Sequence, residues 1–350
     1  MGAKIRVVDS GLRTGRENIA LDAAMIEARR TELISDSFRF IHFKPCALVG
    51  RHQDLAQELN LDACEARNIQ TVRRVTGGGA LYMDEGQLGW ALICDKRIFG
   101  SASLTEITEK ICKAAAAGLS QLGVDAAFRP RNDIEIGGKK ISGTGGFFED
   151  NILMFQGTLI VEANSDNMQA VLNIPAHKLA KHKVGGVEDR VTSLSGELGS
   201  VPAIEQIQEA LLSGFHSELG FDFNWGEHTS EEEGLARQFY DEEIGTDEFV
   251  AEISDPARNS DILCGANKVG NLKAYVRVEG KLNNRLREVL FVGDIFITPP
   301  RALMDLEAHL RGTLIENIEA QTRRFFEAAE IGLVSVQPSE FSDAILKAAA

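Results

Sequence analysis

The chain has 350 residues, 44% of them hydrophobic, which is enough to form two domains that each bury a core. Its 37 basic and 52 acidic residues give a formal net charge of -15, so we expect neither nucleic acid nor an anionic membrane among its partners. An anionic substrate would need a local basic patch on this acidic chain.

The cysteines and the N-terminus indicate the cellular compartment, and the histidines bear on metal binding. The cysteines are odd in number, widely spaced and free of any Cys-x-x-Cys pair: Cys46, Cys64, Cys94, Cys112 and Cys264. We expect buried thiols in a reducing cytoplasm, and the histidines show no metal-ligand spacing. Residues 1–6 lack the apolar core of a signal peptide, and no run approaches about eighteen apolar residues, so a soluble, cytoplasmic protein is expected.

Strand and helix patterns alternate through the first third of the chain. Strands are predicted at 5–8, 38–49, 69–74 and 87–94, and amphipathic helices at 17–32 and 55–67. Ser103 and Glu106 form a capping box that starts a further helix, which runs to Leu122 and stops at Gly123.

The middle of the chain continues this alternation. Two strands are expected to flank a loop that contains Lys140, and a helix at 204–219 ends at Gly220. Between them lies a basic stretch with Lys178, Lys181, Lys183 and Arg190. Because the strands arrive mostly as hairpins with helices between them, we predict an α+β fold with mixed or antiparallel sheets flanked by helices.

A second domain is expected after the polar, acidic stretch that ends near residue 250. We place one domain at 1–250 and a small α+β domain at 251–350. In the second domain, strands at 272–278 and 286–296 precede a helix that starts at 298–300. Its inward face is expected to carry Leu303, Leu306, Leu310 and Leu314.

Two glycine-rich segments are candidate ligand-binding elements. The first contains Arg74, Thr76, Gly77, Gly78, Gly79 and Ala80. Three consecutive glycines let the backbone approach a ligand closely, at an entropic cost that an ordinary turn does not require. A structural turn is the alternative, and the preceding pair of arginines favours ligand binding.

The second segment places a lysine in front of an Ile-Ser-Gly sequence. It contains Asn132, Asp133, Lys140, Ser142, Gly143, Gly157 and Thr158. A lysine held at the end of a strand and aimed into a cleft floored by backbone N–H groups can hold a carboxylate and a phosphate together.

In this order, the two segments resemble the lipoate-protein ligase A family of the biotin and lipoate ligase superfamily. Residues 73–79 are similar to the family's Arg-Arg-x-Ser-Gly-Gly-Gly, and 131–133 match its Arg-Asn-Asp. Residues 50–53 and 190–194 resemble its Ile-Gly-Arg-x-Gln and Arg-Val-Thr-Asn-Leu elements. The last hundred residues more loosely resemble its C-terminal accessory domain.

The resemblance implies an ATP-dependent lipoate-protein ligase. Such an enzyme activates lipoate or octanoate to an acyl-adenylate and transfers the acyl group to a lysine of an acceptor protein. The first step brings two anions together, so the site must supply positive charge in advance. Lys140 matches the family lysine that contacts both the carboxylate and the phosphate, which makes it the candidate catalytic residue, whereas Lys139 is interpreted as a surface lysine.

The resemblance also implies binding roles for other residues. The candidates for binding substrate and lipoyl-AMP are Arg51, Arg74, Thr76, Gly77, Gly78, Gly79, Ala80, Asn132, Ser142, Gly143, Gly157 and Thr158. Asp133 matches a residue that serves the Mg2+ of the nucleotide, although it could equally cap a turn. Leu81, Trp90 and Phe155 are possible walls of an acyl tunnel, with core packing as the alternative.

Two positions depart from the family pattern. Met83 and Gln156 stand where the family usually has histidines, next to Asp84 and Gly157 respectively. Both changes remove an imidazole beside the expected pocket. They are consistent with a sub-branch that differs in acceptor or acyl preference.

Other functions remain open. An octanoyltransferase of the same fold works without ATP through a cysteine thioester, and residues 126–155 contain no cysteine. A biotin ligase would carry a different glycine-and-arginine loop, and a non-catalytic lipoate-binding homologue would not need Lys140. The implied acceptors are a 2-oxoacid dehydrogenase lipoyl domain, the glycine-cleavage H protein or the lipoate-binding protein of sulfur oxidation, and the last hundred residues are expected to form a mobile cover.

Overall fold

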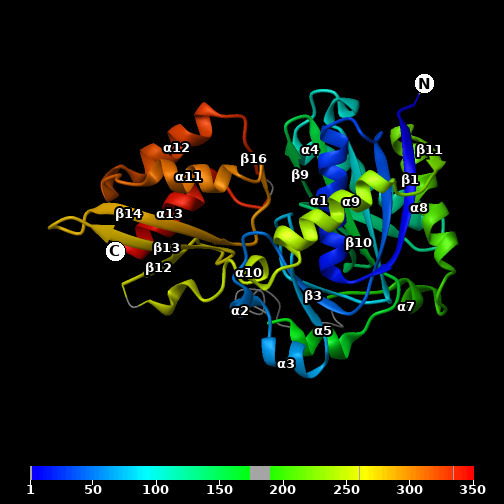
Figure 1. Ribbon diagram of the computed structural model, residues 1–350, viewed down its shortest axis with the longest axis horizontal. Helices are drawn as coiled ribbons and strands as arrows, with labels where there is room; N and C mark the ends of the chain where they lie inside the picture. The colour runs from blue at the N-terminus through cyan, green and yellow to red at the C-terminus, as the bar shows by residue number, and fades with distance from the viewer. Residues whose placement is uncertain (1, 174–189, 260, 334) are drawn as a thin grey trace.

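The structure is a computed structural model in which residues 2–173, 190–259, 261–333 and 335–350 are described. It has a larger N-terminal part, residues 2–253, and a smaller C-terminal part, residues 261–350, which lie side by side (Figure 1). The basic residues Lys178, Lys181 and Lys183 lie outside the described residues. Within the described ranges, the structure contains no helix with the length and apolar character needed to cross a membrane.

An eight-stranded mixed sheet forms the centre of the N-terminal part, in the order β11-β1-β2-β6-β10-β9-β8-β7. Its strands are β1 Lys4–Arg13, β2 Ser37–Phe43, β6 Gln87–Asp95, β7 Ala126–Arg129, β8 Asp133–Ile136, β9 Lys139–Glu149, β10 Ile152–Ile160 and β11 Asp222–Trp225. β1 runs parallel to β2 and β11, and the other neighbours are antiparallel. The predicted α+β class is confirmed.

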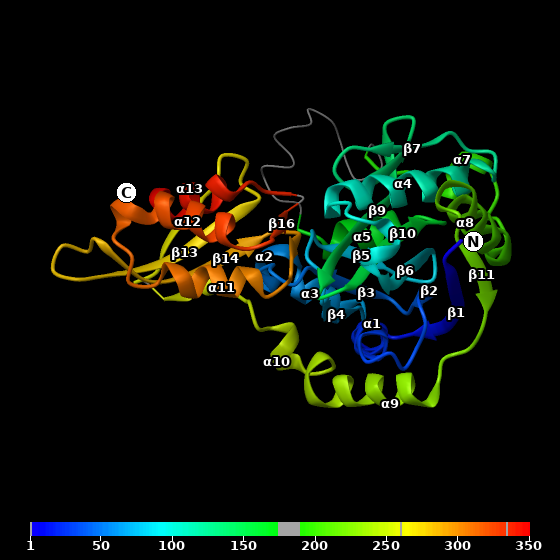
Figure 2. The same cartoon turned by 90° about the horizontal axis from the view of Figure 1, so that it is seen from above.

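Helices cover both faces of this sheet (Figure 2). One face carries α1 Gly15–Arg30 and α9 Ser230–Phe239, and the other carries α4 Leu104–Ser120 and α8 Ile204–Leu219. The capping box of Ser103 and Glu106 starts α4 as predicted, and α8 ends at Gly220 in the left-handed conformation. Trp90 and Phe155 are buried in the core between the sheet and α4 and α8, so core packing is the correct alternative for both.

A three-stranded sheet carries the first glycine-rich segment. In it, β3 Cys46–Val49 pairs with β4 Gln70–Arg73 on one side and with β5 Leu81–Met83 on the other. The single helix predicted at 55–67 is wrong, because the chain forms α2 Leu55–Glu58 and α3 Leu61–Ala66. Asn60 interrupts the helix, since its side chain caps α3 by accepting a hydrogen bond from the Ala63 amide.

The remaining elements of the N-terminal part are short. They are η1 Lys96–Phe99, α5 Ser165–Val171, α7 Leu194–Leu198, η3 Tyr240–Ile244 and α10 Asp247–Val250. Residues of α3, α5, β3 and α10 share a small buried cluster, which joins the glycine-bearing sheet to the segment that leads into the C-terminal part.

The C-terminal part has its own antiparallel sheet and its own buried core. It is preceded by η4 Pro256–Arg258, and its elements are β12 Leu263–Ala266, β13 Leu272–Glu279, β14 Arg285–Gly293, β15 Ile297–Thr298, α11 Ala302–Leu310, η5 Ile315–Asn317, α12 Ile318–Ala328, β16 Gly332–Leu333 and α13 Pro338–Ala349. Leu303, Leu306 and Leu310 are buried on α11 as predicted, but Leu314 lies beyond the end of that helix. The expectation that all cysteines are buried is wrong for Cys264, which is exposed on the edge strand β12.

Candidate active site

The candidate site lies over the face of two neighbouring strands, β9 and β10. Gly143 pairs with Thr158 and Gly145 with Gln156, so these four residues project from the same face of the sheet. All four line a cavity of about 600 Å³. The two glycines leave this floor without side chains at its centre.

Lys140 lies within β9 and not in a loop, which corrects the sequence interpretation. The hairpin before it turns on Gly137 and Gly138, both with positive φ, as a two-residue turn requires. In the pairing of β8 with β9, Ile134 faces Ser142 and Glu135 faces Lys140, so Ile141 is an extra, bulged residue. The bulge turns the Lys140 side chain onto the same face of the sheet as Gly143. If Gly143 carried a side chain, its Cβ would lie 2.6 Å from the Lys140 Nζ, so the ammonium group lies directly over this glycine.

Asp133 and Arg129 hold this ammonium group in place. The Lys140 Nζ lies 2.8 Å from one carboxylate oxygen of Asp133, and an Arg129 Nη donates to the other oxygen at 2.6 Å. Burial alone would raise the pKa of Asp133, but the two cations outweigh it and the pKa is lowered. Arg129 also forms an ion pair with Glu135 at 3.2 Å. Successive ion pairs therefore connect Glu135, Arg129, Asp133 and Lys140.

A segment distant in sequence pairs directly with Lys140. The Lys140 amide donates to the Arg190 carbonyl, and the Thr192 amide donates to the Lys140 carbonyl, both at 2.9 Å. Arg190 and Val191 also line the cavity. The element at 190–194 therefore belongs to the same site as Lys140, although some fifty residues separate them in the sequence.

The triple-glycine segment forms another wall of the cavity and is braced by Arg74. The Arg74 guanidinium is buried and donates to the carbonyls of Gly77 and Gly79 at 3.1 and 3.0 Å. Burial lowers the pKa of Arg74 to about 10, so it stays charged at neutral pH. Thr76 accepts a hydrogen bond from the Gln156 side chain at 2.9 Å, which ties the segment to the sheet.

Two of the three glycines are approached by the chain's own C-terminal part. The Gly78 amide donates to the Ile295 carbonyl at 3.2 Å, and a Cβ on Gly77 would overlap that carbonyl. A Cβ on Gly78 would overlap the ring of Phe296. The close backbone approach that the glycines predict is therefore present, with a protein segment on the other side.

Most of the predicted site residues line this one cavity. Those that do are Arg74, Thr76, Gly77, Gly79, Ala80, Asn132, Asp133, Lys140, Gly143, Gly157 and Thr158, together with Leu81, Met83 and Gln156. Gly78 is enclosed by Phe296 and does not line it. Ser142 is turned to the opposite face of β9, where its buried hydroxyl has no hydrogen-bond partner among the described residues, so its predicted contact with substrate is not supported.

Arg51 does not line this cavity. Its guanidinium pairs with Glu252 and lies over the ring of Phe249, in a separate cavity between the N-terminal and C-terminal parts. The Arg51 amide still donates to the Thr76 carbonyl at 2.9 Å, so residue 51 supports the glycine segment through its backbone. The predicted binding role of its side chain is not supported by this geometry.

Several lining residues escaped the sequence analysis. They are Arg129, Arg131, Asn271, Asp294, Phe296 and Ser335. Arg131 is the first residue of the Arg-Asn-Asp element and Arg129 lies two residues before it, so a search for cations in and near that element would have assigned both to the site. The other four come from the C-terminal part, and no local pattern in the sequence connects them with a site built around Lys140.

The described residues do not form a metal site. No group of three His, Cys, Asp or Glu side chains in the described ranges is arranged to hold a metal ion. Both oxygens of the Asp133 carboxylate already accept from cations. In this arrangement Asp133 positions Lys140, and its expected role toward Mg2+ stays a prediction.

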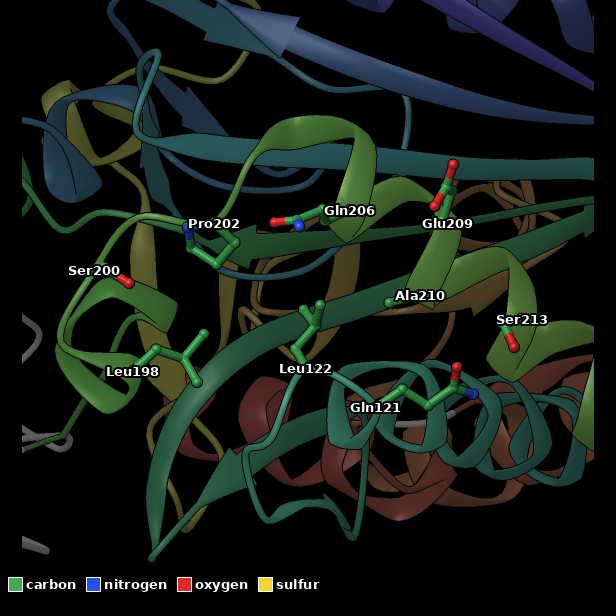
Figure 3. A pocket seen from close by; sticks show the side chains of 9 residues that line it. All are labelled: Gln121, Leu122, Leu198, Ser200, Pro202, Gln206, Glu209, Ala210 and Ser213. Atoms are coloured by element: carbon green, nitrogen blue, oxygen red, sulfur yellow. The ribbon is translucent and has the colours of Figure 1, made fainter.

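A further cavity lies between the end of α4 and the start of α8 (Figure 3). Its volume is about 700 Å³, but of the described residues around it only Glu209 is ionisable. It offers no cluster of charges or nucleophiles comparable with that around Lys140. The cavity on β9 and β10 is therefore the candidate active site.

Comparison with known proteins identifies the family. The profile of the lipoyl protein ligase A/B catalytic domain matches residues 14–216, which are more than half of the chain. The chain belongs to this family. Both glycine-rich segments and the 190–194 element fall within the matched range, and family membership makes the chain an enzyme of the lipoate-protein ligase type.

Relatives within the family include both ligases and transferases. Lipoate–protein ligase 1 of Staphylococcus aureus is 31% identical over 55% of this chain and 58% of its own length. Lipoate-protein ligase A subunit 1 of Thermoplasma acidophilum is 28% identical over 60% of this chain and 82% of its own length. Octanoyltransferase LipM of Symbiobacterium thermophilum is 24% identical over 70% of this chain and 97% of its own length.

Solved structures of this family share the fold. A bipartite lipoate protein ligase of Thermoplasma acidophilum, studied with its E2 lipoyl domain, has a TM-score of 0.62 at 25% identity, covering 72% of this chain and 97% of its own. A lipoate-protein ligase A bound with ATP has a TM-score of 0.61 at 24% identity, covering 72% of this chain and all of its own. Plasmodium falciparum LipL1, solved with lipoate, has a TM-score of 0.72 at 15% identity and covers 99% of both chains, so the likeness in fold extends to the C-terminal part.

Proposed function

We propose that the chain is an ATP-dependent lipoate-protein ligase that forms lipoyl-AMP and transfers the lipoyl group to a lysine of an acceptor protein. The observation that carries this proposal is the Lys140 ammonium, held by Asp133 over the bare glycine floor of the cavity. The ligase names of the relatives in S. aureus and T. acidophilum support it.

The charges around the cavity suit the joining of two anions. Lys140, Arg129, Arg131 and Arg190 line it, which supplies a local basic patch on a chain of net charge -15. At about 4 Å and an effective dielectric near 20, one such cation contributes roughly 4 kcal/mol of attraction to an anion. These fixed charges favour the approach of a carboxylate to a phosphate before any bond forms.

The proposed reaction has two steps. A carboxylate oxygen of lipoate bonds to the α-phosphorus of ATP, and the bond between that phosphorus and the bridging oxygen breaks to release pyrophosphate. The acceptor lysine amine then bonds to the acyl carbon, AMP leaves, and the amine loses a proton. In this scheme Lys140 contacts both the carboxylate and the α-phosphate, and the triple-glycine segment borders the acyl-adenylate.

Magnesium is not assigned to a residue of this site. ATP is ordinarily handled as its Mg2+ complex, but the ion pairs of Asp133 leave its carboxylate occupied. We therefore give Asp133 the role of positioning Lys140. Any Mg2+ would enter with the nucleotide.

The alternative is an octanoyltransferase that needs no ATP, which the likeness to LipM over 97% of that enzyme favours. A thioester route requires a reactive thiolate at the pocket. None of the five cysteines of the chain lines the cavity. Cys112 lies behind its wall, 3.2 Å from the Thr144 hydroxyl, where burial raises the pKa of the thiol to about 12, so the ligase is the better-supported function.

The acceptor, the compartment and the domain division are part of the same proposal. The ligase of T. acidophilum was studied with an E2 lipoyl domain, so we propose a lipoyl domain or another protein that carries an exposed lysine as acceptor, in the cytoplasm. We place the catalytic domain at 1–250 and an accessory domain at 251–350. The separate buried core of the C-terminal part supports this division.

The first test is the substitution Lys140→Ala, with Lys139→Ala as the matched control. Lys139 is exposed and adjacent in sequence, so the control removes the same charge and volume from the neighbouring position. We expect Lys140→Ala to reduce lipoate-dependent exchange of pyrophosphate into ATP by about 100-fold or more, because it removes a fixed charge at the reacting anions. Equal activity of the two variants, with unchanged circular dichroism, would refute the assignment.

A second test separates the ligase from the transferase. Purified protein is given an acceptor domain with either lipoate and ATP or octanoyl-carrier protein without ATP, and acylation is followed by mass spectrometry. The ligase predicts modification only with ATP. Modification from the carrier protein alone would favour the transferase.

A further inference from the structure

We propose that Phe296, a residue of the C-terminal part, is a specificity-determining residue that limits the length of the acyl chain in the cavity. The inference rests on the proposed function. It concerns the substrate class of the same site, namely fatty carboxylic acids and lipoate, and it assigns part of that site to the C-terminal part.

The ring of Phe296 lies on the same floor as the Lys140 ammonium. Gly143 and Gly145 project from one face of β9 two residues apart. The Lys140 Nζ lies above Gly143, and the Phe296 ring lies above Gly145, where a Cβ would overlap it. Ammonium and ring are therefore neighbours along one strand.

The floor extends from Lys140 in only one direction along β9. That strand begins at Lys139, directly after the turn on Gly137 and Gly138. An acid whose carboxylate contacts Lys140 and whose chain follows the strand therefore runs over Gly143 toward Gly145. The ring of Phe296 borders this path at Gly145.

The backbone around Phe296 is fixed, so the ring forms a rigid wall. The Phe296 amide donates to the Ser335 hydroxyl at 3.1 Å, and that hydroxyl donates to the Asp294 carbonyl at 2.8 Å. Ile295 is fully buried in the C-terminal core, and its carbonyl accepts from Gly78. Phe296 itself is only partly buried and lines the cavity, so one side of the ring faces the ligand space.

The glycines on both sides of the ring fit this role. Side chains at Gly78 or Gly145 would overlap the ring, so these positions form a slot for it. The slot holds the ring beside the path of the chain and shortens the space available to that chain. A smaller residue at 296 would lengthen the space without touching Lys140.

The experiment measures the binding of octanoate, decanoate and dodecanoate to the full-length protein by calorimetry without ATP, and then the KM and kcat of each acid in pyrophosphate exchange. Phe296→Ala is expected to raise the affinity for decanoate relative to octanoate by roughly tenfold, since these acids differ by two methylenes and a hydrophobic pocket discriminates one or two methylenes by about that factor. Phe296→Leu keeps most of the side chain that forms the wall, so its relative affinity for the longer acid should lie between those of Phe296→Ala and the wild type.

Two controls separate a local from a global effect. Phe325→Ala removes an equivalent, partly buried ring from the C-terminal core away from the cavity, and it should leave the chain-length profile unchanged. In the wild type, a Cβ at position 145 overlaps the Phe296 ring, so Gly145→Ala should lower the affinity for octanoate. In the Phe296→Ala background the ring is absent, so the same substitution should leave that affinity unchanged.

The outcomes distinguish the inference from the proposed function. If the ratio of the affinities for the longer acid and for octanoate is the same in the wild type and in folded Phe296→Ala, the inference about Phe296 is wrong and the proposed function is not affected. Selective binding of acids without pyrophosphate exchange would overturn the proposed ligase reaction but keep the role of Phe296. If no variant binds any of the acids, both are wrong.

Discussion

At the scale of single residues, the site depends on how Lys140 is turned and held. A strand that continued in regular alternation would place Lys140 on the face of Ser142, away from Gly143. The extra residue Ile141 reverses this, and its own side chain is buried in the core below the sheet. The ion pair with Asp133 then fixes the ammonium before substrate arrives, so little reorganisation is needed during the reaction.

The ion pairs of Asp133 predict how the reaction responds to magnesium. In Asp133→Asn, Lys140 loses its charged partner, and we expect the rate of pyrophosphate exchange to fall by about tenfold or more. The Mg2+ concentration for half-maximal rate should change by less than about threefold, because we assign Asp133 to the positioning of Lys140 and not to the metal. The measurement is the rate as a function of Mg2+ at saturating ATP.

Glu135→Gln is the control for this prediction. Glu135 lies opposite Lys140 in the pairing of β8 with β9, but its carboxylate pairs with Arg129, so this substitution removes a neighbouring charge and leaves the ion pair of Lys140 with Asp133 intact. A rise of about tenfold or more in the Mg2+ requirement of Asp133→Asn alone would show that Asp133 binds the metal.

At the scale of elements, the strand β4 joins the glycine segment to the segment that leads into the C-terminal part. Arg73, its last residue, is fully buried. Its guanidinium donates to the carbonyls of Phe249, Val250 and Ile253 at 2.9–3.2 Å. It also donates to the carbonyls of Gly50, Arg51 and Gln53 at 2.7–3.2 Å. Arg73 therefore holds residues 249–253 against β4 and against residues 50–53.

Removal of the Arg73 side chain should loosen this junction. Arg73→Ala removes a buried guanidinium that donates to six carbonyls, of which those of Gly50, Phe249 and Ile253 keep a backbone donor, and we expect a loss of about 3 kcal/mol or more in the free energy of unfolding. Arg67→Ala removes an exposed guanidinium that donates to Asn167, and it should cost less than about 1 kcal/mol. Chemical denaturation of both variants provides the comparison, and equal stabilities would contradict the role given to Arg73.

At the scale of the whole molecule, the cavity is built by both parts of the chain. The N-terminal part supplies the floor, the cations and the glycine segment, and the C-terminal part supplies Asn271, Asp294, Phe296 and Ser335. Thr298 adds a contact at the boundary, since its hydroxyl accepts from the Phe148 amide at 2.6 Å and donates to the Phe148 carbonyl at 2.8 Å. A hinge that separated the parts would have to lie after Ile253 and break these contacts.

Removal of the C-terminal part tests whether it contributes to the active site. A chain that ends at residue 255 keeps the buried clusters around the large sheet, because these contain no residue from the C-terminal part, so we expect it to fold. It should lose most of its adenylation activity, since the cavity loses one wall to water. Transfer from chemically prepared lipoyl-AMP to an acceptor should be affected less.

The two half-reactions of this fragment are measured separately, with circular dichroism as the control for folding. Full adenylation activity in the folded fragment would show that the C-terminal part only packs beside the site. Loss of both half-reactions to the same degree would assign it a role in every step.

Local residue patterns were sufficient to predict the class of fold, the helices α4 and α8 and the resemblance to the family. The capping box of Ser103 and Glu106 and the glycine stop at Gly220 act within one or two turns of helix, so local chemistry was sufficient to place α4 and α8. The glycine-rich segments are likewise recognised from consecutive residues. This is why most of the predicted site residues do line one cavity.

The way in which the cavity is completed depends on contacts between segments that are distant in the sequence. The bulge at Ile141 depends on the pairing of β8 with β9, and the contact of Lys140 with 190–192 depends on a segment far along the chain. Phe296 reaches Gly78 and Gly145 only because two parts of the chain pack together, and the Arg51 guanidinium pairs with Glu252, which lies far along the sequence, instead of lining the cavity. Such contacts follow from packing between distant segments, which local residue patterns do not encode.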